Sequence, residues 1–124
     1  MKTESKRQFD LEERTEKFAQ EVRRALRQIK PSLMTESDIR QVIRSSGSVG
    51  ANYIEANESV SKKDFALRIK YCRKEAKETA YWLRLLQDQV PPNVKPELIR
   101  LEQESKELTN IFGAIHRKSL LAEK

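Results

Sequence analysis

The chain has 124 residues, with 25 Lys and Arg against 19 Asp and Glu, so its formal net charge is +6. This length predicts one domain with a single core, and the scarcity of Gly and Pro suits long helices. One cysteine and one histidine exclude an intramolecular disulfide and a Cys/His zinc site. The sequence shows no secretory signal and no apolar run of transmembrane length, so we expect a cytoplasmic protein without membrane association.

The first two helices are expected on either side of Pro31, because the residue before a proline is pushed out of helical geometry. Asp10 and Glu13 have the spacing of a capping box at the start of the first helix. The second helix contains a run of small residues, 45–51, with two glycines that each cost about 1 kcal/mol relative to alanine. Close approach of another backbone would compensate for that cost.

The third segment, from Ser61 to Gln89, has the strongest pattern in the chain, and Ser61 is its expected N-cap. Steps of four and three place one stripe toward the core: Phe65, Ile69, Cys72, Ala76, Thr79, Leu83 and Leu86. A second stripe repeats every seven residues and is basic: Lys63, Lys70, Lys77 and Arg84, with Lys74 beside them. Such a row can follow a phosphate backbone without reading bases, although a solvated helix face is the alternative.

A break at Val90-Pro91-Pro92-Asn93 precedes the fourth helix. Pro96 suits the first turn of that helix. Residues from Leu120 onward are expected to fray. Short loops make sequential helices antiparallel neighbours. The sequence therefore predicts an all-α, antiparallel up-down-up-down four-helix bundle in one domain, 1–124. The expected helices cover about 10–30, 36–57, 61–89 and 94–118.

One surface of the predicted bundle looks suited to a second copy of the chain. The outward positions of the second helix are short and uncharged, which is typical of a covered surface, although a solvated serine-rich helix explains them equally well. On the third helix, aromatic side chains alternate with charges at helical spacing, as at an interface edge. The candidate interface residues are Gln41, Ser45, Ser48, Asn52, Glu55, Tyr71, Glu75, Glu78 and Trp82.

Motifs for catalysis or cofactor binding are missing from the sequence. It contains no phosphate-binding glycine loop and no Glu-x-x-His motif for a di-iron site. The serines at 45–48 lie inside a helix without a neighbouring histidine. Glu75 and Glu78 could form an acid/base pair, but an ion-pair role with nearby cations is the stronger interpretation. We therefore expect no enzyme activity, no metal and no cofactor.

Two motifs resemble a known family. Ser48-Val49-Gly50-Ala51-Asn52-Tyr53-Ile54-Glu55-Ala56 is similar to a Ser-Ile-Pro-x-Asn-Ile-Ala-Glu-Gly-like run. Residues 74–86 look like the matching Glu-Thr-x-Tyr-Trp-Leu run of a subgroup. The family is that of bacterial four-helix-bundle proteins, the 23S rRNA intervening-sequence or S23 proteins, which includes the accessory variability protein of diversity-generating retroelements. The resemblance covers roughly 37–88, with Gly50 where many members have Pro and Ala56 where many have Gly.

The resemblance implies an antiparallel bundle that assembles as a homopentamer. It implies a poorly defined role, although the retroelement accessory protein, which is basic like this chain, binds nucleic acid and a reverse transcriptase. Together with the basic row, this leads to the hypothesis of a non-enzymatic, homo-oligomeric bundle that binds RNA or DNA through a basic helix face. The alternative is a protein-interaction scaffold that docks a nucleic-acid enzyme such as a reverse transcriptase and does not itself contact nucleic acid.

Overall fold

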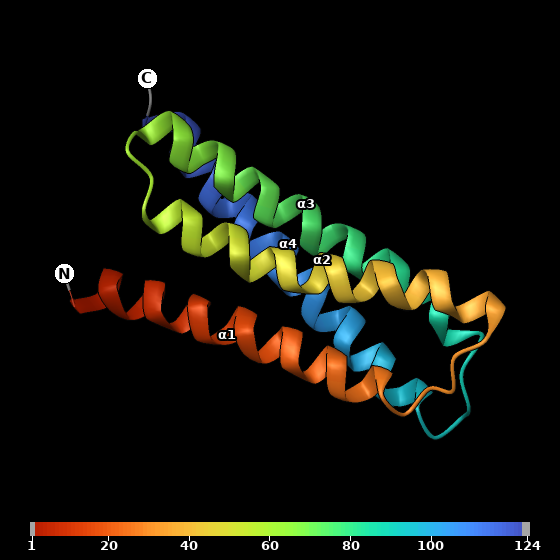
Figure 1. Ribbon diagram of the computed structural model, residues 1–124. Helices are drawn as coiled ribbons and strands as arrows, with labels where there is room; N and C mark the ends of the chain where they lie inside the picture. Colours follow the sequence, from red (N-terminus) through yellow and green to blue (C-terminus); the bar gives the residue numbers. More distant parts are fainter. Residues whose placement is uncertain (1, 123–124) are drawn as a thin grey trace.

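The computed structural model describes the backbone of residues 2–122 and the side chains of residues 10–122. It contains four helices and no strand within residues 2–122: α1 (Lys2–Leu26), α2 (Leu33–Asn57), α3 (Lys62–Gln87) and α4 (Lys95–Ala122). Consecutive helices run in opposite directions (Figure 1). The side-chain contacts agree, since Asp38 near the start of α2 meets Gln89 just beyond the end of α3, while Ser45 meets Thr79. The predicted all-α four-helix bundle is confirmed.

Both predicted ends of α1 were wrong. The helix begins at Lys2 and runs through Asp10, because residues 2–9 contain no Gly or Pro that would stop it. Asp10 and Glu13 therefore do not cap its start. At the other end α1 stops at Leu26, where a tight turn follows in which the Ile29 N–H donates to the Leu26 carbonyl. This turn buries Ile29 in the core before Pro31 is reached.

The other helix boundaries lie close to the predicted ones. Ser32 caps α2 and forms a capping box with Thr35, so α2 starts slightly earlier than expected. Ser61 caps α3 as predicted, its side chain accepting from the Asp64 N–H at 3.0 Å. Pro96 lies in the first turn of α4. This helix continues to Ala122 where a frayed tail was expected, and the last two positions of that tail lie outside the described residues.

The core follows the predicted stripes. On α3, every residue of the predicted core stripe is buried except Phe65, which is half-buried and packs against the others. Helix α3 packs extensively against both α2 and α4, whereas α1 makes far fewer contacts with α4. Burial raises the pKa of the Cys72 thiol to about 12, so this side chain is an inert part of the core.

Polar side chains within the core are paired. Ser105 Oγ donates to the Ala76 carbonyl across the α3–α4 contact at 2.6 Å. Thr15 Oγ1 donates to the Leu11 carbonyl within α1 at 2.8 Å. Because a buried hydroxyl without a partner costs about 1–3 kcal/mol, these bonds allow polar residues to occupy core positions.

The two glycines of α2 face α1, and the predicted close approach of another backbone applies to Gly50, whereas Gly47 meets a side chain. A Cβ placed on Gly50 would lie 2.9 Å from Thr15 Oγ1 and 3.8 Å from the Thr15 carbonyl carbon. One placed on Gly47 would lie 3.0 Å from Nη2 of Arg23. Side-chain atoms of α1 are thus closer to these glycines than its backbone is.

Candidate nucleic-acid interface

The predicted basic row lies on the exposed surface of α3. Lys63, Lys70, Lys74 and Lys77 are all exposed, and among the described residues none of them forms an ion pair with a carboxylate. Arg84 differs from these lysines, because its Nη1 lies 3.4 Å from Glu102 Oε2. Most of the row is therefore available to an external anion.

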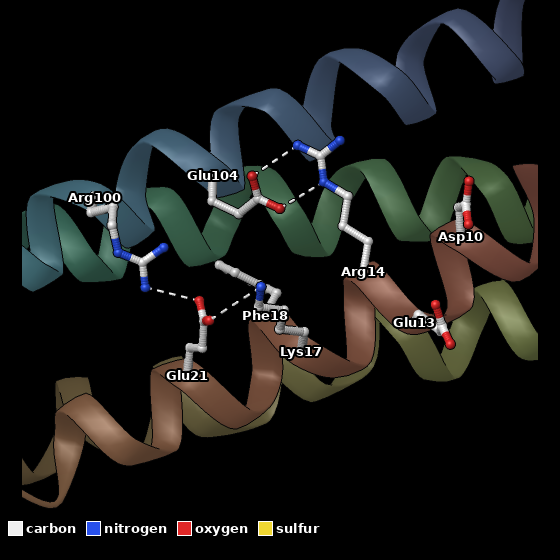
Figure 2. A pocket seen from close by; sticks show the side chains of 8 residues that line it. All are labelled: Asp10, Glu13, Arg14, Lys17, Phe18, Glu21, Arg100 and Glu104. Carbon is white, nitrogen blue, oxygen red and sulfur yellow. Dashed lines mark hydrogen bonds and ion pairs between the residues drawn. The ribbon is translucent and has the colours of Figure 1, made fainter.

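The ion pairs between α1 and α4 use carboxylates from both helices. Arg14 Nε lies 2.7 Å from Glu104 Oε2, and Arg100 Nη2 lies 2.8 Å from Glu21 Oε1 (Figure 2). The hydrogen bonds that Arg14 donates to Glu104 raise the pKa of its guanidinium. These pairs cross a cleft of about 490 Å³ between α1 and α4. The α1–α4 side of the bundle is thus balanced in charge.

Two carboxylates of α3 also point away from the basic row. Glu75 Oε1 and Glu78 Oε1 lie 3.3 and 3.4 Å from the guanidinium of Arg44 on α2. The predicted ion-pair role of these two residues is therefore correct, with Arg44 as the cation. A shared arginine also explains how two neighbouring carboxylates can coexist on one helix face.

Helix α4 extends the basic surface across its contact with α3. Lys106 and Arg84 both pair with the buried Glu102, which also accepts from Gln87, so Lys106 lies beside the end of the α3 row. Burial alone would raise the pKa of Glu102, but the hydrogen bonds from Gln87 and Lys106, together with the charges of Lys106 and Arg84, lower it. Glu102 is thus a charged carboxylate within a larger positive surface.

Farther along the same contact, Arg73 of α3 and Arg117 of α4 both lie over Gly113. A Cβ on Gly113 would be 3.4 Å from Arg73 Nε and 3.6 Å from Arg117 Nη1. We call the whole surface the α3–α4 basic face. It consists of Lys63, Lys70, Arg73, Lys74, Lys77, Arg84, Lys106 and Arg117.

Sequence reasoning missed three members of this face: Arg73, Lys106 and Arg117. Arg73 is three residues after Lys70 and four before Lys77, a spacing that places it on the same side of a helix. On α4, Lys106, Gly113 and Arg117 follow one another at steps of seven and four, which also indicates one side of a helix. The signal was therefore present, but only the packing of α3 on α4 shows that the two sets adjoin.

The structure brings the two halves of the predicted oligomer interface together along the α2–α3 contact, which we call the α2–α3 strip. One assignment needs correction: Ser45 is fully buried inside the protomer, where its Oγ lies 2.7 Å from Thr79 Oγ1. A serine is small enough to fit between two helices, so its position near an outward stripe was misleading. The other strip residues are half-buried or exposed: Gln41, Ser48, Asn52, Glu55, Tyr71, Glu75, Glu78 and Trp82.

Apolar side chains are exposed beside this strip. Leu67 is 45%, Tyr71 39% and Leu85 37% exposed, all on the outer side of α3. Trp82 is half-buried next to them, and its Nε1 is shielded from solvent without a hydrogen-bond partner among the described atoms. By contrast, Asn52 satisfies its side-chain amide within α2, donating to the Ser48 carbonyl at 2.9 Å. The strip combines satisfied polar groups with uncovered apolar surface.

Two features are absent from the described part of the chain. Within residues 2–122, no helix is both long enough and apolar enough to cross a bilayer. The same part of the chain contains no cluster of three or more His, Cys, Asp or Glu side chains that could hold a metal ion.

Comparison with known proteins supports the resemblance seen in the motifs. A crystal structure of a protein with unknown function from the S23 ribosomal protein family, from Bacteroides thetaiotaomicron VPI-5482, is similar to this chain at 26% sequence identity. The match covers 85% of this chain and 96% of the other, with a TM-score of 0.69. Comparison with curated proteins gives no match. Residues 7–114 match the family model described as "23S rRNA-intervening sequence protein", so the chain belongs to that family.

Proposed function

We propose that the protein binds RNA or DNA through the α3–α4 basic face, by contacts to the phosphate backbone. The observation that carries this proposal is the separation of charge around the bundle. Glu75 and Glu78 of α3 pair with Arg44 of α2, and ion pairs in both directions join α1 to α4, whereas lysines along the outer side of α3 have no such partner among the described residues. Rows of unpaired cations attract phosphates and release counterions on binding, which favours association without base contacts.

The geometry of the face suits a polyanion. Lys63, Lys70 and Lys77 recur every seven residues and therefore lie about 10 Å apart along α3. Lys106 and Arg117 provide a second basic line on α4, beside the first. The family description names 23S rRNA, which makes structured RNA the first ligand to test and duplex DNA the second.

A gel-shift titration tests this proposal with charge-reversal variants. We expect Lys70→Glu combined with Lys74→Glu and Lys77→Glu to weaken binding strongly and to lower the log–log salt slope by roughly two to three units. The matched control reverses Arg24, Arg27 and Lys30, which are exposed at the end of α1 and in the turn after it. It changes the net charge equally and should keep most of the affinity. Absence of binding at low salt, or equal loss in both triple variants, would refute the proposal.

We further propose that copies of the chain associate through the α2–α3 strip, with the pentamer implied by the family resemblance as the expected assembly. The exposed Leu67, Tyr71 and Leu85 support this, because large apolar side chains lose unfavourable contact with water when a partner covers them. Light scattering should give a mass of several chains for the parent protein. Leu67→Lys with Tyr71→Lys should give a smaller mass, whereas Ile99→Lys, a similar exposed change on α4, should not.

A scaffold for a partner protein is the second candidate function, favoured by the same exposed apolar strip. Unlike nucleic-acid binding, the scaffold function requires that a partner protein stays bound after nucleic acid is removed. Pull-down with nuclease-treated extract should retain a defined partner if the strip is a docking surface for another protein, and Tyr71→Lys should release it. If the parent is already a closed oligomer and retains no partner, the scaffold function is wrong.

A further inference from the structure

Arg73 and Arg117 come from different helices, yet both guanidinium groups lie over the same glycine. The distances of 3.4 and 3.6 Å from a Cβ on Gly113 mean that Arg73 Nε and Arg117 Nη1 are no farther apart than the sum of these two values. Neither arginine forms an ion pair with a carboxylate of the described residues. Two like charges this close repel each other unless an anion lies between or above them.

The chemistry of this place fits one anion in particular. A guanidinium presents several N–H donors in a planar fork, which matches the oxygens of a phosphate better than a lysine ammonium does. Gly113 has no side chain, so both guanidinium groups can approach the same point above its backbone. Both arginine side chains are exposed to solvent, so a phosphate can reach them without any change of fold.

The position of the two arginines within the basic face indicates which molecule would supply such a phosphate. Arg73 lies between Lys70 and Lys77 on α3, and Arg117 continues the line of Lys106 on α4. We propose that Arg73, Arg117 and Gly113 form a single phosphate-binding site, in which both guanidinium groups hold one backbone phosphate of the bound nucleic acid. This inference rests on the proposed function: the lysines attract the polyanion, and the arginine pair anchors one of its phosphates.

A double-mutant cycle in nucleic-acid binding tests whether the two arginines act as one site. We expect Arg73→Gln and Arg117→Gln each to weaken binding about ten-fold, and the double variant to be little weaker than either. Lys63→Gln and Lys77→Gln form the control, because these positions lie about 21 Å apart along α3 and contact different phosphates. Their separate losses should multiply. If the losses of the arginine variants also multiply, or are absent, the single site is refuted.

Inorganic phosphate tests the site without nucleic acid. In NMR spectra of the full chain, the Nε–Hε signals of Arg73 and Arg117 should shift with one common dissociation constant when phosphate replaces chloride at constant ionic strength. The signal of Arg24 should not follow them, and Arg73→Gln should remove most of the response of Arg117. Phosphate-dependent shifts in a protein that fails to bind RNA or DNA would refute the proposed function but retain this site. Nucleic-acid binding without these shifts would refute the site alone.

Thermal unfolding checks that the Arg73 and Arg117 variants keep the stability of the parent protein. Neutralising either arginine removes a like-charge contact in the free protein, so the unfolding midpoint should stay equal or rise. A lowered midpoint in both single variants would mean that the arginines stabilise the bundle instead, and would count against the proposed role.

Discussion

At the scale of single residues, Gly47 and Gly50 look equivalent in the sequence but meet different atoms of α1. Gly50 lies under Thr15, whose short side chain is fixed by its hydrogen bond to the Leu11 carbonyl. Gly47 lies under the far end of Arg23, a long side chain that bonds the Ile43 carbonyl and Ser46 Oγ but needs to shift by only a few tenths of an ångström. The space above each glycine is therefore limited by groups of different rigidity, although the two positions are only three residues apart.

This difference predicts opposite effects of the same substitution. Gly50→Ala should lower the free energy of unfolding by up to about 2 kcal/mol, because overpacking against Thr15 costs about 1–3 kcal/mol, against a helix-propensity gain of about 1 kcal/mol. Gly47→Ala should be neutral or stabilise the protein by up to about 1 kcal/mol. Urea unfolding measures both. Adding Thr15→Ala to Gly50→Ala should recover part of the loss, and equal effects of the two glycine variants would contradict this account.

At the scale of elements, α1 is attached to the bundle differently from α3. Helix α3 is buried between α2 and α4 through apolar side chains, whereas α1 meets α4 largely through ion pairs across an open cleft (Figure 2). Arg100 is central to this contact, since it bonds Glu21 of α1 and Glu97 of its own helix. The α1–α4 contact is therefore sensitive to protonation, whereas the apolar core that α1 shares with the other helices is not.

The pH dependence of an Arg100 variant follows from the carboxyl group beside it. The hydrogen bond from Arg100 lowers the pKa of Glu97 below the ordinary value of 4.5. A carboxylate with a lowered pKa stabilises the fold above its unfolded pKa and loses this effect as the pH falls through its folded pKa. Arg100→Gln should therefore lower the unfolding midpoint at pH 7, and the difference from the parent should shrink below pH 4.5.

Thermal melts between pH 3 and pH 7 would measure this difference, at about one-unit steps. Arg27→Gln is the matched control, because Arg27 is exposed and forms no ion pair among the described residues. It should show no such pH dependence. A difference for Arg100→Gln that stays constant down to pH 3 would mean that the arginine acts through packing of its aliphatic stem.

At the scale of the whole molecule, charge is divided among the sides of the bundle. The α1–α4 side carries pairs of opposite sign, and the α2–α3 strip carries a cation shared by two carboxylates. Among the described residues, most cations of the α3–α4 basic face have no carboxylate partner. Self-repulsion on that face opposes folding, so any anion that binds there also stabilises the native state.

Pyrophosphate should therefore raise the unfolding midpoint more than sodium chloride does at the same ionic strength. The extra stabilisation follows from preferential binding to the folded state, and it should increase with the logarithm of pyrophosphate concentration above its dissociation constant. The Lys70, Lys74 and Lys77 charge-reversal variant should lose most of this increment. An equal response to both salts would show that the face binds no anion beyond general screening.

Periodicity was sufficient to predict the bundle and the core stripe of α3, because helical spacing determines which side chains can share a face. It did not place the ends of α1, since residues 2–9 carry no stop signal and the final turn depends on burying Ile29. Arg73 and Arg117 were missed for a different reason. Their meeting over Gly113 depends on the register of α3 against α4, which long-range contacts such as Ser105 with Ala76 determine.

The shielded indole of Trp82 has a spectroscopic consequence. Trp82 is the single tryptophan of the chain, so the tryptophan fluorescence of the protein depends on the surroundings of this residue on the α2–α3 strip. The ring of Tyr81 lies 5.0 Å away, centroid to centroid, close enough to transfer excitation to the indole. Covering the strip by a second copy would change the polarity around Trp82, and dilution would reverse that change. The emission maximum of the unlabelled protein should therefore shift when copies of the chain associate.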